Sequence, residues 1–430
     1  MKSGTSRRVE WTALLLSTRC GKRLRNVGAV VGALVAVSVG FAPNAAAYDA
    51  QSKQWYLEPM HAEQMWKVST GKGVKVAVVD TGVNANTPSL KGQVLADEVP
   101  AAVAYHDTDD YDSHGTTMAE LIAGTGAGGG LKGLAPGAKI VPYRVRLDGL
   151  SKAEGKKTPK PWDAIKAAAE TDAKIISMSI GQDVVNPDLE AAINYAASKG
   201  KLLIAAVGNQ GEGKGTIGYP AAYPYVVGVA STDSTATVSK TSSYGNYVDL
   251  SAPGEGFPGW CDATFRSYCV GNRGTSAAAA ITSAAAALIW SAHPDWTVNQ
   301  VTRSLIDTAG RTWAKGNPSK YAGYGFIRPR KVLENPNYNA GAANVDPLAK
   351  ENGGNLLAKS ASSSSTASPP SASATSQAQQ KTSTGGTSAA GSNADSSNDS
   401  NTLWIALGGA AAVVVISGTG VAVMRARRAR

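Results

Sequence analysis

The chain has 430 residues, and its 42 basic and 32 acidic side chains give a formal net charge of +10. The excess charge lies at the ends: residues 1–47 hold seven basic residues against one acidic residue, and residues 424–430 hold four arginines. The chain between these ends is neutral, so the basic residues indicate membrane topology and exclude a basic surface for nucleic acid.

Residues 1–47 are predicted to form a signal peptide. A basic stretch precedes an apolar run from Val27 to Phe41, and the small residues Ala45 to Ala47 then provide a cleavage site. Because the basic region is long, an uncleaved membrane anchor remains the alternative. A signal peptide would place the rest of the chain in a compartment where disulfides persist.

Residues 48–73 are predicted to be an extension of the following domain. The segment falls below the roughly 40 residues that fold alone without disulfides or metal. It carries Trp55, Tyr56 and Trp66, whose burial would hold it on the domain. We therefore expect a structural extension that the mature protein retains, and not a cleavable propeptide.

Residues 74–345 are predicted to form one α/β domain. Apolar, β-branched runs predict strands buried on both faces, and longer Ala-rich or amphipathic runs predict helices. The predicted strands are 74–80, 138–145, 173–181, 201–209, 225–230 and 246–254. The predicted helices are 116–124, 162–172, 188–200, 276–293 and one ending at Thr308, which a Thr297–Gln300 capping box opens. This alternation favours a mostly parallel sheet with helices on both faces.

Three strings far apart in the chain supply the parts of a serine-nucleophile triad. Asp80 lies in VAVVDTGV, His114 in DSHGTTMAE and Ser276 in GNRGTSAAAA. The imidazole would accept the serine proton, and the carboxylate would orient the imidazole. Ligands of such sheets bind beyond the carboxyl ends of the strands. Asp80 ends a predicted strand, and His114 and Ser276 open helices, so all three can meet at one edge.

A fourth string, AAVGNQG (205–211), supplies Asn209 as a donor to the oxyanion that forms during acyl transfer. Taken singly, Ser276 could be a helix cap and Asp80 or Asn209 a turn residue. The agreement of four strings favours catalysis.

Residues 208–214, GNQGEGK, resemble a phosphate-binding loop, but Gly215 replaces the required Ser or Thr and no helix follows. Nucleotide binding is therefore not expected.

No metal or other cofactor is expected. His106 lies among the aspartates of residues 106–114, which could bind the metal of a metal-dependent hydrolase, but a solvated acidic loop is the simpler interpretation.

Cys261 and Cys269 remain after signal removal, and an even pair in an oxidising compartment predicts a disulfide. Two free thiols are the alternative.

The C-terminal part is predicted to anchor the protein in a membrane. Residues 346–402 are rich in Ser, Ala and Thr and indicate a disordered linker. Residues 403–423 are uncharged and long enough for a transmembrane helix. The arginines of residues 424–430 would keep that tail in the cytoplasm, which gives a type I protein with its domain outside. A GPI signal is disfavoured, because such signals do not end in arginines.

The triad strings resemble those of the subtilisin-like (S8) serine peptidases. The opening of residues 54–83 and the layout with a signal, a linker and a single C-terminal helix resemble the mycosins, membrane-anchored subtilases of type VII secretion. The resemblance implies a segment that pairs with substrate as an extra strand, and one wall of the pocket for the side chain before the cleaved bond. The first comprises Ser179, Ile180 and Gly181; the second comprises Ala206, Val207 and Gly208.

The sequence departs from the family pattern at three positions. Ala280 stands where proline is expected, Ala277 replaces a bulkier residue, and Thr117 replaces a frequent histidine. None of these changes removes a catalytic group. We therefore expect an extracytoplasmic, membrane-anchored serine endopeptidase that acts on proteins or peptides. The resemblance implies secretion-machinery membrane proteins as partners, and the alternative is a non-catalytic scaffold with the subtilase fold.

Overall fold

The computed structural model describes residues 49–145, 147, 149–213 and 218–352. The predicted signal peptide, transmembrane helix and cytoplasmic tail lie outside these residues, as does most of the predicted linker. Their assignments therefore stay predictions.

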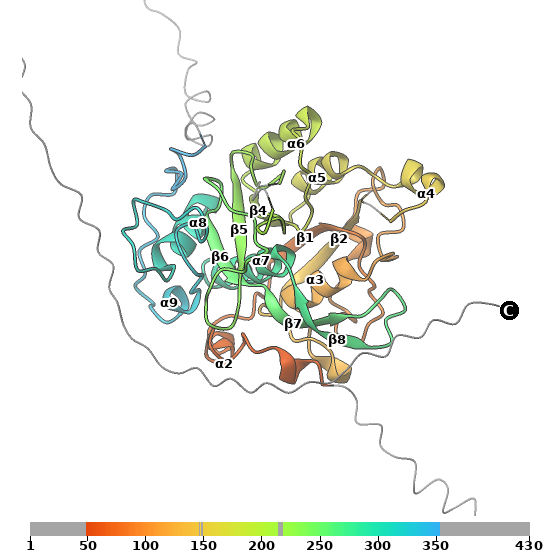
Figure 1. The fold of residues 1–430 in the computed structure, drawn as a ribbon, viewed down its shortest axis with the longest axis horizontal. Coiled ribbons are helices and arrows are strands. Elements are labelled where there is room, and N and C mark those ends of the chain that lie inside the picture. The colour runs from red at the N-terminus through yellow and green to blue at the C-terminus, as the bar shows by residue number, and fades with distance from the viewer. Residues whose placement is uncertain (1–48, 146, 148, 214–217, 353–430) are drawn as a thin grey trace, which may run out of the picture. The chain divides into compact units, whose positions relative to one another are not determined.

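A parallel six-stranded sheet forms the centre of the domain, with strand order β2-β1-β3-β4-β5-β6 (Figure 1). The strands are β1 Lys75–Asp80, β2 Lys139–Arg144, β3 Ile175–Met178, β4 Leu202–Ala206, β5 Val226–Thr232 and β6 Leu250–Pro253. Each predicted strand has a counterpart, which confirms the predicted sheet. Strands β3 and β4 end earlier than predicted, because the residues after Met178 and Ala206 leave the ladder to line a cleft.

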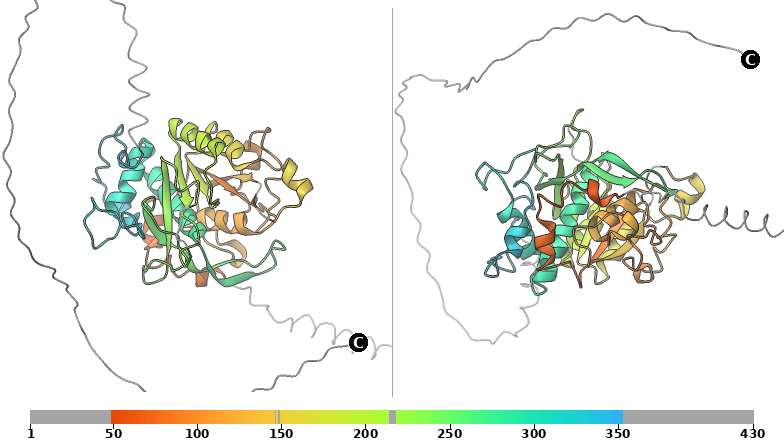
Figure 2. Two further views of the ribbon diagram at one scale, coloured as in Figure 1. Left: turned by 45° about the horizontal axis from the view of Figure 1, so that its top comes forward. Right: turned by 90° about the horizontal axis from the view of Figure 1, so that it is seen from below.

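Helices cover both faces of this sheet, as predicted (Figures 1 and 2). One face packs against α3 (His114–Ala123) and α7 (Thr275–Ala292). The other face packs against α5 (Pro161–Ala169) and α6 (Pro187–Ser198). The domain is therefore a three-layer α/β structure.

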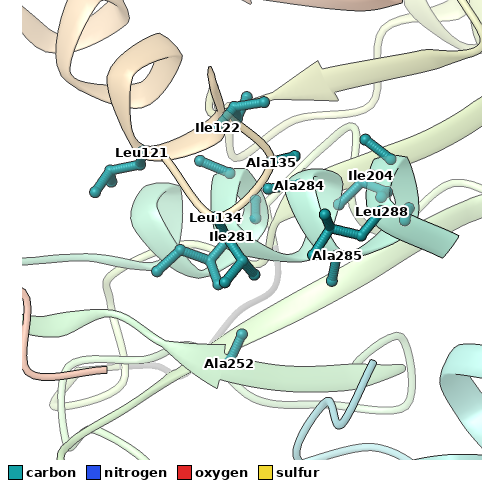
Figure 3. Packing of buried hydrophobic residues seen from close by; sticks show 14 of the residues in the cluster. Leu121, Ile122, Leu134, Ala135, Ile204, Ala252, Ile281, Ala284, Ala285 and Leu288 are labelled. Atoms are coloured by element: carbon teal, nitrogen blue, oxygen red, sulfur yellow. The ribbon is translucent and has the colours of Figure 1, made fainter. Parts of the chain in front are cut away.

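Helix α7 is the central helix of the first layer. Figure 3 shows Ile281 and Leu288 of this helix among Ile204 and Ala252 of the sheet and Leu121 of α3. Its many alanines let it approach the sheet closely, in keeping with the density of protein interiors. In the described part of the chain, α7 alone is long and apolar enough to cross a membrane, but 83% of it is buried inside the domain. It is a core helix.

Helix α8 (Val298–Thr308) begins with the predicted capping box.

The remaining helical elements are short. They are η1 Gln51–Lys53, α2 Ala62–Trp66, η2 Ala96–Glu98, η3 Ala127–Gly129, α4 Lys152–Lys157 and α9 Arg330–Leu333. Sequence periodicity did not predict them, because one or two turns are too few to show a helical repeat.

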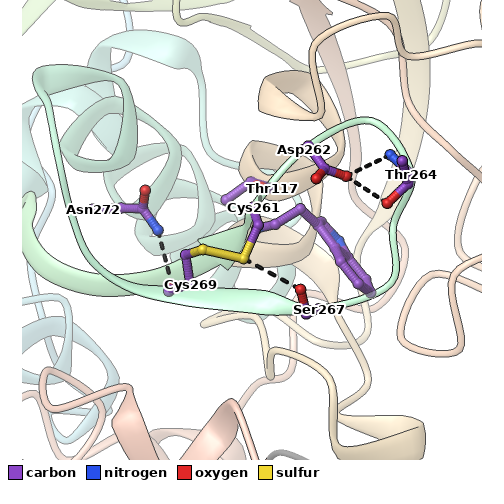
Figure 4. The surroundings of a disulfide bond; sticks show 8 residues. Thr117, Cys261, Asp262, Thr264, Ser267, Cys269 and Asn272 are labelled. Carbon is purple, nitrogen blue, oxygen red and sulfur yellow. Dashed lines mark hydrogen bonds between the residues drawn. A yellow bond between two sulfur atoms is a disulfide. The ribbon is translucent and has the colours of Figure 1, made fainter. Parts of the chain in front are cut away.

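A second, two-stranded sheet was also not predicted. Strands β7 (Glu255–Trp260) and β8 (Tyr268–Arg273) form an antiparallel hairpin with two register shifts. Strand β7 has the sequence EGFPGW, and the sequence pattern does not indicate a strand there because glycine and proline are rare inside strands. A disulfide between Cys261 and Cys269 closes the hairpin near its end (Figure 4).

The N-terminal extension is an integral part of the domain. Tyr56 is fully buried in the main hydrophobic cluster. The indole Nε1 of Trp55 donates to the Glu255 carbonyl at 2.8 Å, and that of Trp66 donates to the Leu134 carbonyl at 2.8 Å. The segment is thus bound by both burial and hydrogen bonds to distant parts of the fold.

The domain also continues beyond the predicted boundary at residue 345. Leu348 is buried, and the Asn352 side chain accepts a hydrogen bond from the Tyr225 backbone at 2.6 Å. Tyr324 donates to Glu351 at 2.7 Å. The domain therefore extends at least to Asn352, because these residues find apolar and polar partners on it.

We predict that the extension stays attached in the active protein. Its removal would expose the site of Tyr56, and losing a buried aromatic side chain costs about 3–5 kcal/mol. N-terminal sequencing of active protein should therefore give a start near Tyr48. A start near Gly73, with activity appearing only after that cut, would identify the segment as a propeptide.

Candidate active site

Asp80 and His114 form a hydrogen-bonded pair at the carboxyl edge of the sheet. Asp80 is the last residue of β1, and His114 is the first residue of α3. The carboxylate is fully buried, and its Oδ1 lies 2.7 Å from His114 Nδ1. The Thr81 backbone N–H donates to the same oxygen at 2.8 Å. With Nδ1 facing Asp80, the imidazole presents Nε2 to another partner.

The surroundings of His114 favour its protonated form. Burial lowers the pKa of the imidazole, but the charge and hydrogen bond of Asp80, with smaller contributions from Asp110 and Asp112, outweigh burial and raise this pKa to about 9. The side chain is 33% exposed, so solvent reaches it on its free side. The imidazole can therefore gain a proton readily and still exchange it with a bound group.

Asp110 holds the segments that carry this pair through hydrogen bonds to Thr81 and Thr116, a role that the sequence did not reveal. Its Oδ1 accepts from the Thr81 hydroxyl at 2.7 Å, and its Oδ2 accepts from the Thr116 backbone at 2.8 Å. The Thr81 hydroxyl in turn accepts from the Gly115 backbone at 2.9 Å. One carboxylate thus joins the end of β1 to the first turn of α3. It also satisfies backbone donors that a helix start leaves free.

The interpretation of residues 106–114 as a solvated loop is wrong for two of its aspartates. Asp107 and Asp110 are only 7% exposed. Asp107 faces Arg144, and burial raises the pKa of Asp107 to about 6. The described residues contain no group of three or more His, Cys, Asp or Glu side chains placed to hold a metal.

Gly115 permits the close approach of β1 and α3. A Cβ at this position would lie 2.1 Å from the Gly82 carbonyl oxygen, closer than any real contact. Gly82 is also tightly enclosed, because a Cβ there would lie 2.6 Å from the Asp109 carbonyl oxygen.

Ser276 and Asn209 lie together at the same edge. Ser276 is in the first turn of α7, and Asn209 follows β4 by three residues. Asn209 Oδ1 accepts from the backbone N–H and hydroxyl of Thr275, at 2.9 and 3.1 Å. These bonds fix the amide plane and leave its nitrogen as a donor beside Gly274. Thr275 was not singled out from the sequence, although it precedes the candidate nucleophile.

Two clefts of about 270 Å³ each meet at Ser276 and Asn209. His114 lines one cleft together with residues of the β7–β8 hairpin. The other is lined by Ser179, Ile180, Gly181, Ala206 and Gly208, the predicted substrate-binding residues apart from Val207. Val207 is fully buried in the core of the opposite layer, because alternate residues of a strand face opposite sides. It does not line this cleft.

Comparison with known proteins agrees with this arrangement. The model of the subtilase family matches residues 71–325. Thermitase of Thermoactinomyces vulgaris is 35% identical over 289 residues, covering 63% of this chain and 95% of thermitase. The family match spans both clefts and the candidate residues.

Solved structures show the same fold. MycP1 of Mycobacterium smegmatis is 25% identical with a TM-score of 0.55, covering 70% of this chain and 89% of MycP1. MycP3 of the type VII (ESX-3) secretion system is 28% identical with a TM-score of 0.54, covering 68% and 90%. MycP1 is also known with its N-terminal propeptide removed, at 28% identity, a TM-score of 0.54 and coverage of 67% and 99%. The chain therefore belongs to the subtilase family and is a subtilisin-like serine endopeptidase.

Proposed function

We propose that this protein is a membrane-anchored, extracytoplasmic endopeptidase that uses Asp80, His114 and Ser276 as its triad. The observation that carries the proposal is the position of His114. Its Nδ1 is bound to buried Asp80, and its free side faces a cleft shared with Ser276 and Asn209. These are the groups that acyl transfer needs.

Each residue has a defined part in the reaction. His114 takes the proton of the Ser276 hydroxyl as its oxygen attacks the substrate carbonyl carbon. The carbonyl oxygen becomes an oxyanion that the Asn209 amide stabilises. His114 then gives its proton to the leaving amine, the C–N bond breaks, and an acyl-enzyme remains. Water, deprotonated by His114, hydrolyses the acyl-enzyme and restores Ser276.

The cleft lined by Ser179 to Gly181 is proposed to bind the chain that precedes the cleaved bond. Ile180 and Gly181 follow β3 and so can continue the sheet with a bound peptide strand. Ala206 and Gly208 would form a wall of the pocket for the side chain before the cleaved bond. The Ser179 hydroxyl donates to the Ser276 carbonyl at 3.1 Å, which ties this segment to the nucleophile.

The setting of this chemistry is proposed from the layout of the chain and its relatives. The signal peptide, the linker after Asn352 and the uncharged residues 403–423 support a type I membrane protein. The likeness to MycP3, a protease of a type VII secretion system, supports substrates or membrane partners in such a pathway.

Ser276→Ala should lose nearly all peptidase turnover while the fold is kept, because alanine is smaller and a good helix former. In a comparable enzyme, removal of the serine costs on the order of 10⁶-fold in kcat. Hydrolysis of peptides found by profiling a secreted-protein mixture measures this. Comparable turnover in the variant would contradict the assignment, and normal secretion despite lost turnover would assign the essential role to a scaffold.

Peptidase activity should rise with pH up to about 9, the raised pKa of His114. Only the neutral imidazole accepts the serine proton, so kcat/KM should fall as pH drops through this value. Asp80→Asn removes the charge that raises the pKa of His114, so the fall of kcat/KM with decreasing pH should shift to lower pH in this variant. Its kcat should also drop by about 10⁴-fold. A profile that is flat between pH 6 and 9 and insensitive to Asp80→Asn would refute the role of His114.

A protease added outside intact cells should cut the linker after Asn352 and release a soluble, active domain. The type I topology places residues 353–402 outside the membrane, where a low-complexity chain is readily cut. Immunoblotting with one tag before the linker and one after Arg430 measures this. Protection of the linker, with loss of the C-terminal tag instead, would reverse the topology.

A further inference from the structure

The segment between β2 and α5 carries a cluster of exposed lysines. From Ser151 to Pro161, which includes α4, the chain has four lysines and a single acidic residue, Glu154. Among the described residues, none of these lysines forms an ion pair. Because the chain between its basic ends is neutral, the cluster is a local feature of the surface. Its members, all exposed, are Lys152, Lys156, Lys157 and Lys160.

The one acidic residue of this segment faces the domain and not the lysines. The Tyr105 hydroxyl lies 3.3 Å from both carboxylate oxygens of Glu154, and Arg144 Nη2 lies 3.6 Å from one of them. Arg144 is buried, so the charge of Glu154 balances a charge inside the fold. Gly155 and Thr158 are buried too and hold α4 in place. The lysines are left as uncompensated positive charge on the outer face.

This distribution of charge is unfavourable for α4 itself. Lys152 and Lys156 are four residues apart, so they lie on one face of the helix, where like charges destabilise it. Lys156 and Lys157 gain from the helix dipole in the last turn, but Lys152 opposes it in the first. A helix of six residues has little stability of its own. A bound partner of opposite charge would remove this repulsion, so the cluster is suited to an anionic ligand.

The lysine cluster lies at the same edge of the sheet as the triad. Helix α4 follows β2, whose last residue, Arg144, is paired in register with Asp80 at the end of β1. The contact of Arg144 with Glu154 fixes α4 beside this edge. Figure 1 shows α4 at the periphery of the domain. None of the four lysines lines either cleft at Ser276. A group bound to them therefore belongs to a part of the substrate away from the cleaved bond.

The chain that precedes the cleaved bond passes on the side of this helix. Its proposed partner, Ser179 to Gly181, continues β3, and Ala206 and Gly208 form the wall on the β4 side. The bound chain therefore lies on the β1 side, toward the segment that leads from β2 into α4. Asp112 lines the cleft of His114 and disfavours further negative charge close to the bond.

We propose that the lysines of α4 and Lys160 form a binding surface for an acidic stretch of the polypeptide substrate, before the cleaved bond and outside both clefts. The inference rests on the proposed function, because that function decides which way the substrate runs. Attraction between exposed charges acts over about 8 Å at physiological salt, so the surface draws such a chain to the clefts. It lowers KM and leaves kcat unchanged, because the lysines do not touch the reacting atoms.

Three quenched peptides with the same residues around the cleaved bond test this proposal. Well before the bond, one carries a run of aspartates, one a neutral run and one a run of lysines. The full-length protein in phosphatidylcholine nanodiscs should cleave the aspartate peptide with a kcat/KM roughly tenfold above that of the neutral peptide, mainly through KM, as a few exposed ion pairs allow. Added salt should shrink this preference.

Changing the four lysines together to glutamine should remove the preference for the aspartate peptide. Turnover of the neutral peptide should stay unchanged, which also shows that the variant folds. Changing them to glutamate should transfer the preference to the lysine peptide. A matched control changes four other exposed lysines to glutamine and should keep the preference for aspartate; these are Lys53, Lys67, Lys91 and Lys331.

Equal cleavage of the three peptides by the unchanged protein, or a preference that survives in the glutamine variant, would overturn the proposal. Equal cleavage together with lysine-dependent binding of phosphatidylglycerol vesicles would assign the surface to a lipid headgroup instead. Ser276→Ala should cleave none of the peptides but still bind the labelled aspartate peptide more tightly than the neutral one, as fluorescence anisotropy measures. Cleavage by this variant would refute the proposed function separately from the binding surface.

Discussion

The bond between Asp80 and His114 is the interaction on which the site depends. Asp80 is a fully buried carboxylate, and a buried charge is stable only when it is paired and hydrogen-bonded. Because Asp80 ends β1 and His114 begins α3, their hydrogen bond holds the N-terminus of α3 against the edge of the sheet. The Thr81 hydroxyl, which donates to Asp110 and accepts from the Gly115 backbone, holds the two elements together, and the absence of a side chain at Gly115 lets them approach closely.

The same junction explains why the surrounding layers are built from small residues. Helix α7 must bring Ser276 to the edge that holds His114 and Asn209, and it does so by lying against five strands and α3. The buried run Ala277–Ala280 permits that depth. Helix α3 also binds the β7–β8 hairpin, because Thr117 and Glu120 accept hydrogen bonds from it. One helix thus carries His114 and binds the hairpin.

The ends of the domain are bound by the same means. The N-terminal extension contributes Tyr56 to the main cluster and reaches the hairpin through the Trp55 bond to Glu255. The segment up to Asn352 packs against the opposite end of the fold through Leu348 and Tyr225. The aromatic residues of the extension predicted its packing, whereas residues 346–352 were assigned to the linker, because so short a segment without periodicity does not show where its side chains are buried.

The sequence by itself determined the chemistry and the order of layers. Strings around Asp80, His114, Ser276 and Asn209 carry their own reactive groups, and apolar periodicity along β1 to α7 predicts a parallel sheet. The tertiary structure alone decided what surrounds those groups. Asp110, Thr275 and Glu120 act through partners far away in the chain, Val207 faces the core, and the glycine-rich β7 is a strand only because β8 and α3 bind it. Local propensity cannot encode such contacts, since their energy exists only when distant segments meet.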